Sequence, residues 1–182
     1  MKTLGVLCVV AFVSVAAADI ESGLKAGEKV PALKAYGLVG ATENKVTDFA
    51  ADRKDEPTVY LFVQSEHFSR PMARFMKELD GKIGDAGEKA AAVAVWVGDK
   101  SFENDKNRIP KIHGSLKFEK TALAAFEGEK SGPNGWGVNP DAHLTVIVVN
   151  KGKVVKSFAY VSVNEKDVRE VMAELKKAID KK

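Results

Sequence analysis

The segment with the most potential for chemistry is FVQSEHFSRPM, residues 62–72, which joins an apolar run to an amphipathic stretch. Many α/β proteins place reactive groups where a buried strand gives way to a helix. The polar groups here are the imidazole of His67 and the hydroxyl of Ser69. A second imidazole, His143, directly precedes another apolar run. The sequence therefore raises the question of whether these groups meet and react.

Two kinds of chemistry fit these residue types. A serine hydroxyl is reactive only beside a base, here one of the two histidines, which Asp141 or Glu66 would orient. The same imidazoles and carboxylates are also a possible ligand set for a metal ion. Against both, Ser69 fits a helix N-cap with Pro71 in the first helical turn, and no nucleophile-elbow motif surrounds it. We therefore assign no catalytic residue, cofactor or metal.

Three apolar runs rich in β-branched residues predict buried strands, at 58–64, 89–99 and 143–149. Between the first two, apolar residues at helical spacing predict a helix that begins at Ser69. After the third run, NKG predicts a tight turn into a further strand. Asn164 then caps a last amphipathic helix. This order predicts parallel strands with a crossover helix, followed by antiparallel strands.

Other segments carry weaker patterns. Residues 31–45 predict one or two short edge strands, and the next residues predict one helical turn capped by Thr47 or Asp48. Residues 100–140 are hard to interpret, with Pro110 as an interruption and a helix or strand near 115–126. We expect His113 to be exposed. Trp136 either packs into the domain, which we favour, or anchors a partner.

The N-terminus is typical of a secretory signal peptide. One lysine precedes an apolar run from Leu4 to Val15, and three alanines follow, which predicts cleavage after Ala18. A retained membrane anchor is the alternative, although the run is short for a span of about 20 residues. The only cysteine, Cys8, lies in this leader. The mature chain, residues 19–182, would then have no thiolate for redox chemistry.

Composition limits the kinds of partner. The chain of 182 residues is 45% hydrophobic and 29% charged, which favours one globular domain. Its formal net charge of +3 falls to +2 without Lys2 of the leader. Positive and negative side chains alternate along the chain. We therefore expect neither a nucleic-acid partner nor, after cleavage, a membrane partner.

Taken together, these segments resemble a thioredoxin-like domain of the redoxin or peroxiredoxin-like branch, over residues 27–182. AGEKVPALKAYGLVG is similar to the opening segment of redoxins, and TVYLFVQSEHFSRPMARFMKEL is similar to their active-site strand, loop and helix. The most specific match is GWGVNPDAHLTVIVVNKGKVVKSFAYV with the helix after it. The resemblance implies a three-layer α/β fold with a central mixed sheet, a crossover helix, a C-terminal β-hairpin and a C-terminal helix.

Two departures from the family pattern bear on activity. The family's redox pair is C-x-x-C, and the matching residues are Ser69 to Met72 in one register or His67 to Arg70 in another, neither with a thiol. The family's cis-proline before threonine is replaced by Leu144 before Thr145. Because a cis bond before a residue other than proline costs about 2.5–4 kcal/mol, we expect this bond to be trans.

We therefore predict an exported (periplasmic or secreted) pseudoenzyme without thiol–disulfide activity, which binds an unidentified protein or peptide. The alternatives are a redoxin-family oxidoreductase or antioxidant-type enzyme that works without its own cysteines, and a metal-binding accessory protein. The predicted binding surface comprises His67, Phe68, Ser69, Arg70, Pro71, Met72, His143, Leu144 and Thr145.

Overall fold

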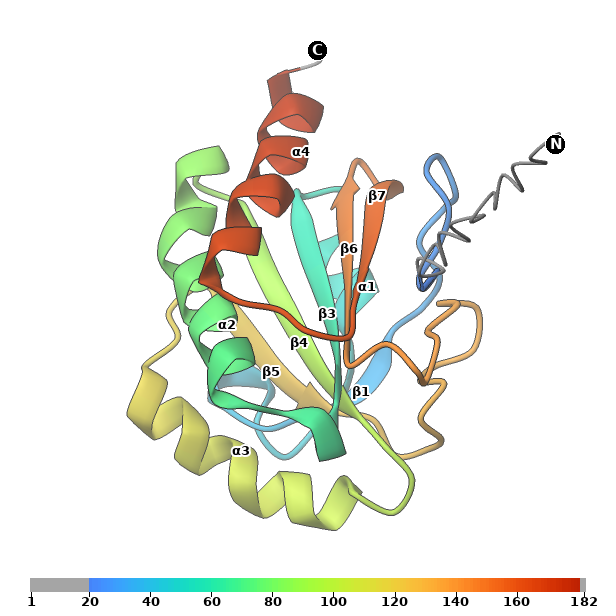
Figure 1. The fold of residues 1–182 in the computed structure, drawn as a ribbon, viewed down its shortest axis with the longest axis vertical. Helices are drawn as coiled ribbons and strands as arrows, with labels where there is room; N and C mark the ends of the chain where they lie inside the picture. The colour runs from blue at the N-terminus through green and yellow to red at the C-terminus, as the bar shows by residue number, and fades with distance from the viewer. Residues whose placement is uncertain (1–19, 181–182) are drawn as a thin grey trace, which may run out of the picture.

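A computed structural model describes residues 20–180, so the predicted leader and Cys8 lie outside the described residues. A seven-stranded mixed sheet in the order β2-β1-β5-β4-β3-β6-β7 forms the centre of the domain (Figure 1). The strands are β1 (Lys34–Gly37), β2 (Val46–Asp48), β3 (Thr58–Gln64), β4 (Ala91–Val97), β5 (Thr121–Ala125), β6 (Leu144–Asn150) and β7 (Lys153–Tyr160). The predicted α/β arrangement, with a central mixed sheet, a crossover helix, a C-terminal hairpin and a C-terminal helix, is confirmed.

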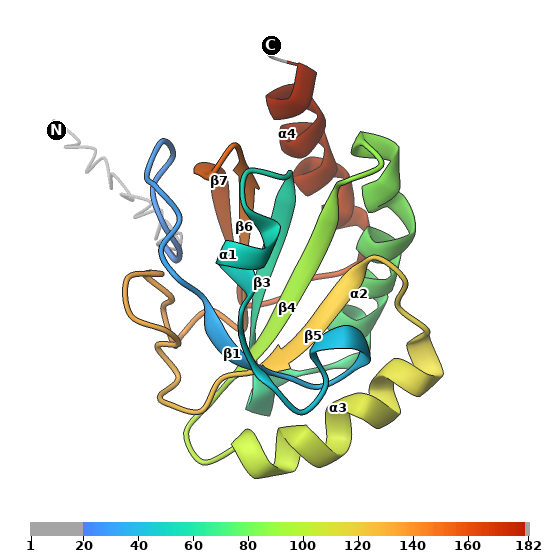
Figure 2. The same ribbon diagram turned by 180° about the vertical axis from the view of Figure 1, so that it is seen from behind.

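Three helices cover one face of the sheet, and a short helix lies on the other. The helices are α1 (Phe49–Arg53), α2 (Arg70–Ile83), α3 (Phe102–Leu116) and α4 (Val168–Asp180), with 3-10 turns at 40–42, 65–67, 84–86 and 165–167. Figure 1 shows α2 and α4 across the front of the sheet, and Figure 2 shows α1 on the opposite face. The described part of the chain contains no helix with the length and apolarity needed to cross a membrane.

The predicted central strands are buried because apolar side chains pack on both of their faces. β3 pairs in parallel with β4 through the α2 crossover and antiparallel with β6. Alternate residues of β3 contribute to two cores: Leu61 packs under α2 and α4, whereas Phe62 packs against Trp136 on the other face. The Trp136 side chain is fully buried, so the interpretation that it packs into the domain is confirmed.

The predicted helix starts are also observed. Asp48 caps α1 by accepting a hydrogen bond from the Ala51 N–H. Asn164 and Asp167 form a capping box before α4. Ser69 occupies the N-cap position of α2, but its side chain makes no capping hydrogen bond.

The segment at 100–140 differs from the prediction. Its helix, α3, begins earlier and includes Pro110, because burial of Ile109 against the sheet outweighs the missing backbone donor. The strand β5 follows, so the region near 115–126 holds a helix end and a strand together. His113 is half-buried rather than exposed, and its ring centroid lies 6.3 Å from that of Phe118.

Candidate functional site

The sheet brings together the two segments that the sequence singled out. β3 ends at Gln64, beside the start of β6, and the Gln64 N–H donates a 3.0 Å hydrogen bond to the His143 carbonyl. From there the chain forms the 3-10 turn at 65–67 and enters α2 after Ser69. The loop before α2 and the turn before β6 therefore share one end of the sheet.

His67 and His143 meet at this end of the sheet. Their rings stack with centroids 3.7 Å apart and planes inclined by 14°. The Glu66 carboxylate lies 3.5 Å from the His67 Nε2 and accepts a 2.6 Å hydrogen bond from the Lys130 ammonium. A chain of contacts thus links the β5–β6 loop, the turn after β3 and the start of β6.

The electrostatics of this pair follow from burial and neighbouring charge. Burial lowers the pKa of His143 below its ordinary value, and the nearby His67 lowers it further. The hydrogen bond from Lys130 lowers the pKa of Glu66, so this carboxylate stays ionised. At neutral pH, His143 is therefore an uncharged ring that can stack closely on its neighbour.

A polar network beneath the surface fixes the turn that carries His67. Asp105 on α3 is fully buried, and its carboxylate accepts hydrogen bonds from the Ser65 hydroxyl and from the Arg108 guanidinium, the latter at 2.9 Å. Arg108 also donates to the Ser65 carbonyl at 3.2 Å and lies 5.8 Å from the centre of the Phe68 ring. The Phe68 ring also meets Trp96 edge-on, with centroids 5.7 Å apart. Phe68 is therefore held in one place.

Three of the nine predicted surface residues are not at the surface. Met72 lies on the apolar face of α2 and is 2% exposed, whereas Leu144 and Thr145 are fully buried in β6. Thr145 shares a 2.6 Å hydroxyl–hydroxyl hydrogen bond with Ser22. The peptide bond before Leu144 is trans, as expected. The accessible residues, which we call the candidate surface, are His67, Phe68, Ser69, Arg70, Pro71 and His143.

The candidate surface does not have the geometry of a serine nucleophile. Within residues 20–180, no hydrogen bond joins Ser69 to His67 or His143, whose rings face each other instead. Within the same residues, no group of three or more histidine, cysteine, aspartate or glutamate side chains is arranged to hold a metal ion. The candidate surface combines two stacked imidazoles with the Phe68 ring, Pro71 and the exposed Arg70 guanidinium.

No family model matches the chain, and no curated protein matches it. Solved structures do. Peroxidoxin BcpB from Mycobacterium tuberculosis superposes with a TM-score of 0.62 at 14% identity, over 85% of this chain and 97% of its own. A DsbF homologue from Corynebacterium diphtheriae superposes with a TM-score of 0.58 at 17% identity, and the match covers 93% of this chain and 99% of the homologue's chain.

A third similar structure is BsSco, a member of the Sco family of cytochrome c oxidase assembly proteins. Its TM-score is 0.61 at 16% identity, over 89% of this chain and 100% of its own. The structural neighbours are thus thioredoxin-like redoxins, as the sequence motifs predicted, and the likeness shows the fold. Residues 20–180 of this chain contain no cysteine.

Proposed function

We propose that this thioredoxin-like domain of redoxin type is exported and binds a protein or peptide through the candidate surface, without redox chemistry. One observation carries the proposal: the strand end, turn and helix start of the redoxin site persist, but residues 20–180 supply no thiol. Without a thiolate, electrons cannot be exchanged with a disulfide. We therefore propose that the site acts by contact with a partner.

The side chains of the candidate surface favour binding. Phe68 is half-buried and contacts both Trp96 and Arg108, so an apolar ring is held in position before a partner arrives. Arg70 is exposed and, within the described residues, forms no ion pair. Aromatic residues and arginine are the types that most often dominate the energy of protein interfaces.

The export predicted from the leader would place this activity outside the cytoplasm. One neighbour, BsSco, belongs to a family of assembly proteins. An assembly role is compatible with a domain that acts by contact. The redox terms in the names of the neighbours describe those proteins, and we do not extend them to a chain that has no thiol in its described part.

A charge reversal at Arg70 tests the proposal. Peptides selected from a displayed random library on the wild-type protein should bind Arg70→Glu at least about tenfold more weakly, because loss of an arginine at an interface hot spot costs about 2 kcal/mol or more. The matched control is Lys176→Glu, which makes the same charge change at an exposed position of α4. Equal affinity of the two variants for every selected peptide would refute the proposal.

A further inference from the structure

The outer edge of β7 is only partly covered. β7 is the last strand of the sheet, and residues 27–30 pair with its first residues. The Val154 N–H donates to the Glu28 carbonyl at 2.9 Å, and the Gly27 N–H donates to the Val154 carbonyl at 2.8 Å. Beyond this point, no backbone–backbone hydrogen bond within residues 20–180 reaches the β7 edge, although the Ser157 hydroxyl donates a 2.6 Å hydrogen bond to the Leu24 carbonyl.

The register of the sheet determines which backbone groups point to this open edge. Successive residues of an antiparallel ladder direct their N–H and C=O groups to alternate sides. The His143 carbonyl bonds to β3, so the backbone N–H and C=O groups of the next residue, Leu144, point toward β7. Leu144 lies opposite Tyr160, so the backbone groups of Tyr160 point back toward β6. Ser157 and Ala159, at odd spacing from Tyr160, present their N–H and C=O groups outward.

A groove runs along this open edge. Its volume is about 470 Å³, and it lies between residues 20–26 and the β7 residues Lys156, Ser157 and Ala159. Figures 1 and 2 both show this N-terminal segment beside β7. We call this space the β7 groove. It has main chain on both sides.

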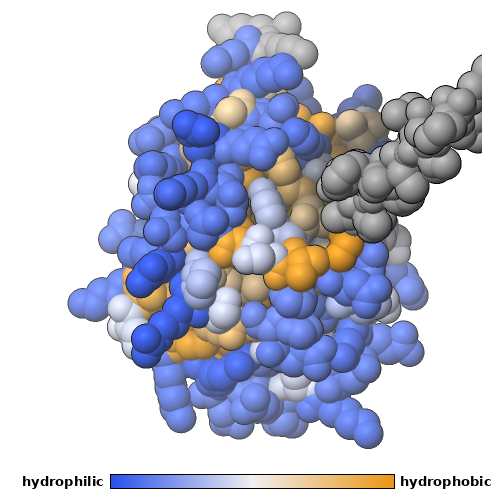
Figure 3. All heavy atoms as spheres, in the orientation of Figure 1, coloured by the Kyte–Doolittle hydropathy of each residue, from blue (hydrophilic) through white to orange (hydrophobic). Residues whose placement is uncertain are grey.

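The end of β7 provides an apolar contact beside the candidate surface. Val161 is 50% exposed and directly follows Tyr160, which lies opposite Leu144, the residue after His143. Figure 3 shows hydrophobic surface in the middle of this face, where the chain leaves β7 for α4. Val46, the other exposed large hydrophobic residue within 20–180, lies on β2 at the opposite edge of the sheet.

We propose that an extended peptide segment of the partner occupies the β7 groove and adds a strand to the sheet along residues 157–161. Its main chain would pair with the outward groups of Ser157 and Ala159, and an apolar side chain would cover Val161. The strand part of this stretch, residues 157–160, spans about 10 Å from end to end, and Val161 follows it directly. This proposal rests on the proposed function, because the strand would end at His143.

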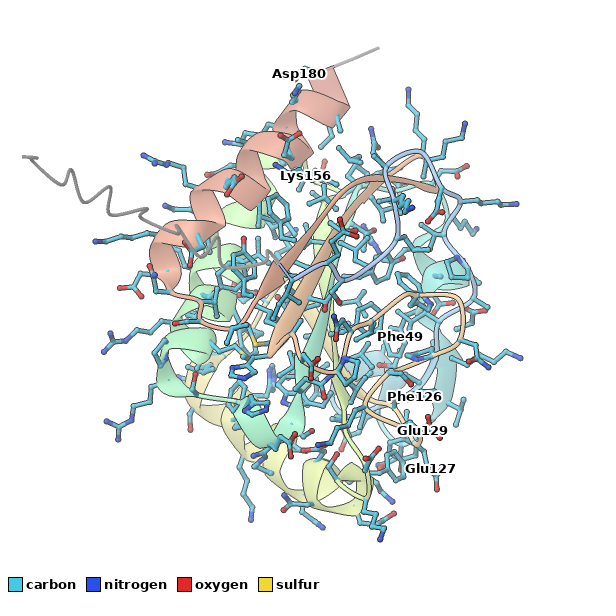
Figure 4. All side chains as sticks on the ribbon, turned by 45° about the vertical axis from the view of Figure 1, so that its right-hand side comes forward. Phe49, Phe126, Glu127, Glu129, Lys156 and Asp180 are labelled. Atoms are coloured by element: carbon cyan, nitrogen blue, oxygen red, sulfur yellow. The ribbon has the colours of Figure 1, made fainter. Side chains whose placement is uncertain are left out.

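The geometry and the charges favour a single peptide chain over a second copy of this protein. Residues 20–26 form the second wall of the groove, and a second copy would have to bring its own N-terminal segment into the same space. Lys156, the cation that β7 contributes to the groove, lies beside α4 (Figure 4) and pairs with Glu170 at 3.3 Å and Glu174 at 3.8 Å. The opposite wall carries one acid and one base, Glu21 and Lys25, so the groove has no strong excess of either charge. Recognition therefore depends mainly on main chain and apolar contact.

The test uses the purified protein and a defined probe. The probe is an acetylated, amidated octapeptide of alternating valine and threonine with a lysine at each end, and its control has N-methyl groups that remove the main-chain donors. Saturable binding of the probe should shift the amide resonances of Ser157 and Ala159. Val161→Lys and Ala159→Pro should each weaken binding by about tenfold, whereas Val46→Lys should leave it unchanged.

The outcomes separate this proposal from the proposed function. One outcome is that Arg70→Glu no longer binds the library peptides while Val161→Lys binds the probe as tightly as the wild type does. This outcome would overturn strand addition and leave the proposed function standing. Equal binding of the N-methylated probe, or no saturable probe binding, would also overturn strand addition. So would a dimer that Val161→Lys dissociates, since a second copy would then occupy the groove. Val161→Lys alters a half-exposed side chain, so the test holds even if Ala159→Pro fails to fold.

Discussion

Replacing Trp136 with alanine should lower the free energy of unfolding by about 3–5 kcal/mol. The indole is fully buried, with its ring centroid 4.9 Å from Tyr60 and 5.0 Å from Phe62. Its Nε1–H donates a 3.0 Å hydrogen bond to the Ala32 carbonyl. Truncation would leave a large cavity and an unpaired carbonyl. Urea titration followed by circular dichroism measures the change.

Trp136→Phe is the matched control. It keeps an aromatic ring between Tyr60 and Phe62 but removes the hydrogen bond to Ala32, so we expect a smaller loss of about 1–2 kcal/mol. A loss below about 1 kcal/mol for Trp136→Ala would contradict the packing role. It would favour the alternative in which this side chain is free to anchor a partner.

Replacing Asp105 with alanine should lower the free energy of unfolding by about 2–3 kcal/mol. The fully buried carboxylate accepts from the Ser65 hydroxyl and the Arg108 guanidinium. Its removal leaves the buried Ser65 hydroxyl without its acceptor and Arg108 with only the Ser65 carbonyl. The expected loss lies below that for a wholly buried ion pair because the Arg108 side chain is 34% exposed. Urea titration provides this value as well.

The control for Asp105→Ala is Glu103→Ala on the same helix, where the carboxylate is 76% exposed and the expected change is within about 0.5 kcal/mol. A double-mutant cycle with Ser65→Ala isolates the contact that holds the 3-10 turn. Equal stability changes at Asp105 and Glu103 would show that the buried network does not support the candidate surface.

The parts of the fold with strong local patterns could be predicted from the sequence. Uninterrupted apolar runs identified β3, β4 and β6 because both faces of these strands are covered. The turn after Asn150 and the cap at Asn164 are local signals, and both are observed. Proximity of His67 and His143 followed from the resemblance, since in that fold the two loops meet at one end of the sheet.

The remaining features depend on contacts between distant parts of the chain. Asp105 is one of several acids in a charged stretch, and the only local signal of its burial was its position four residues before Ile109, on the same helical face. Thr145 lies in β6 between β3 and β7, and the distant Ser22 provides the hydrogen-bond partner of its buried hydroxyl. Partial cover of the β7 edge likewise depends on the N-terminal segment, whose polar sequence shows no strand pattern.

Intact-mass spectrometry of the exported protein, before and after treatment with iodoacetamide, tests the central claim most directly. The account predicts a chain that begins at Asp19, gains no mass on alkylation and reduces insulin no faster than buffer. A mature chain that retains Cys8, is alkylated there and reduces insulin would contradict it.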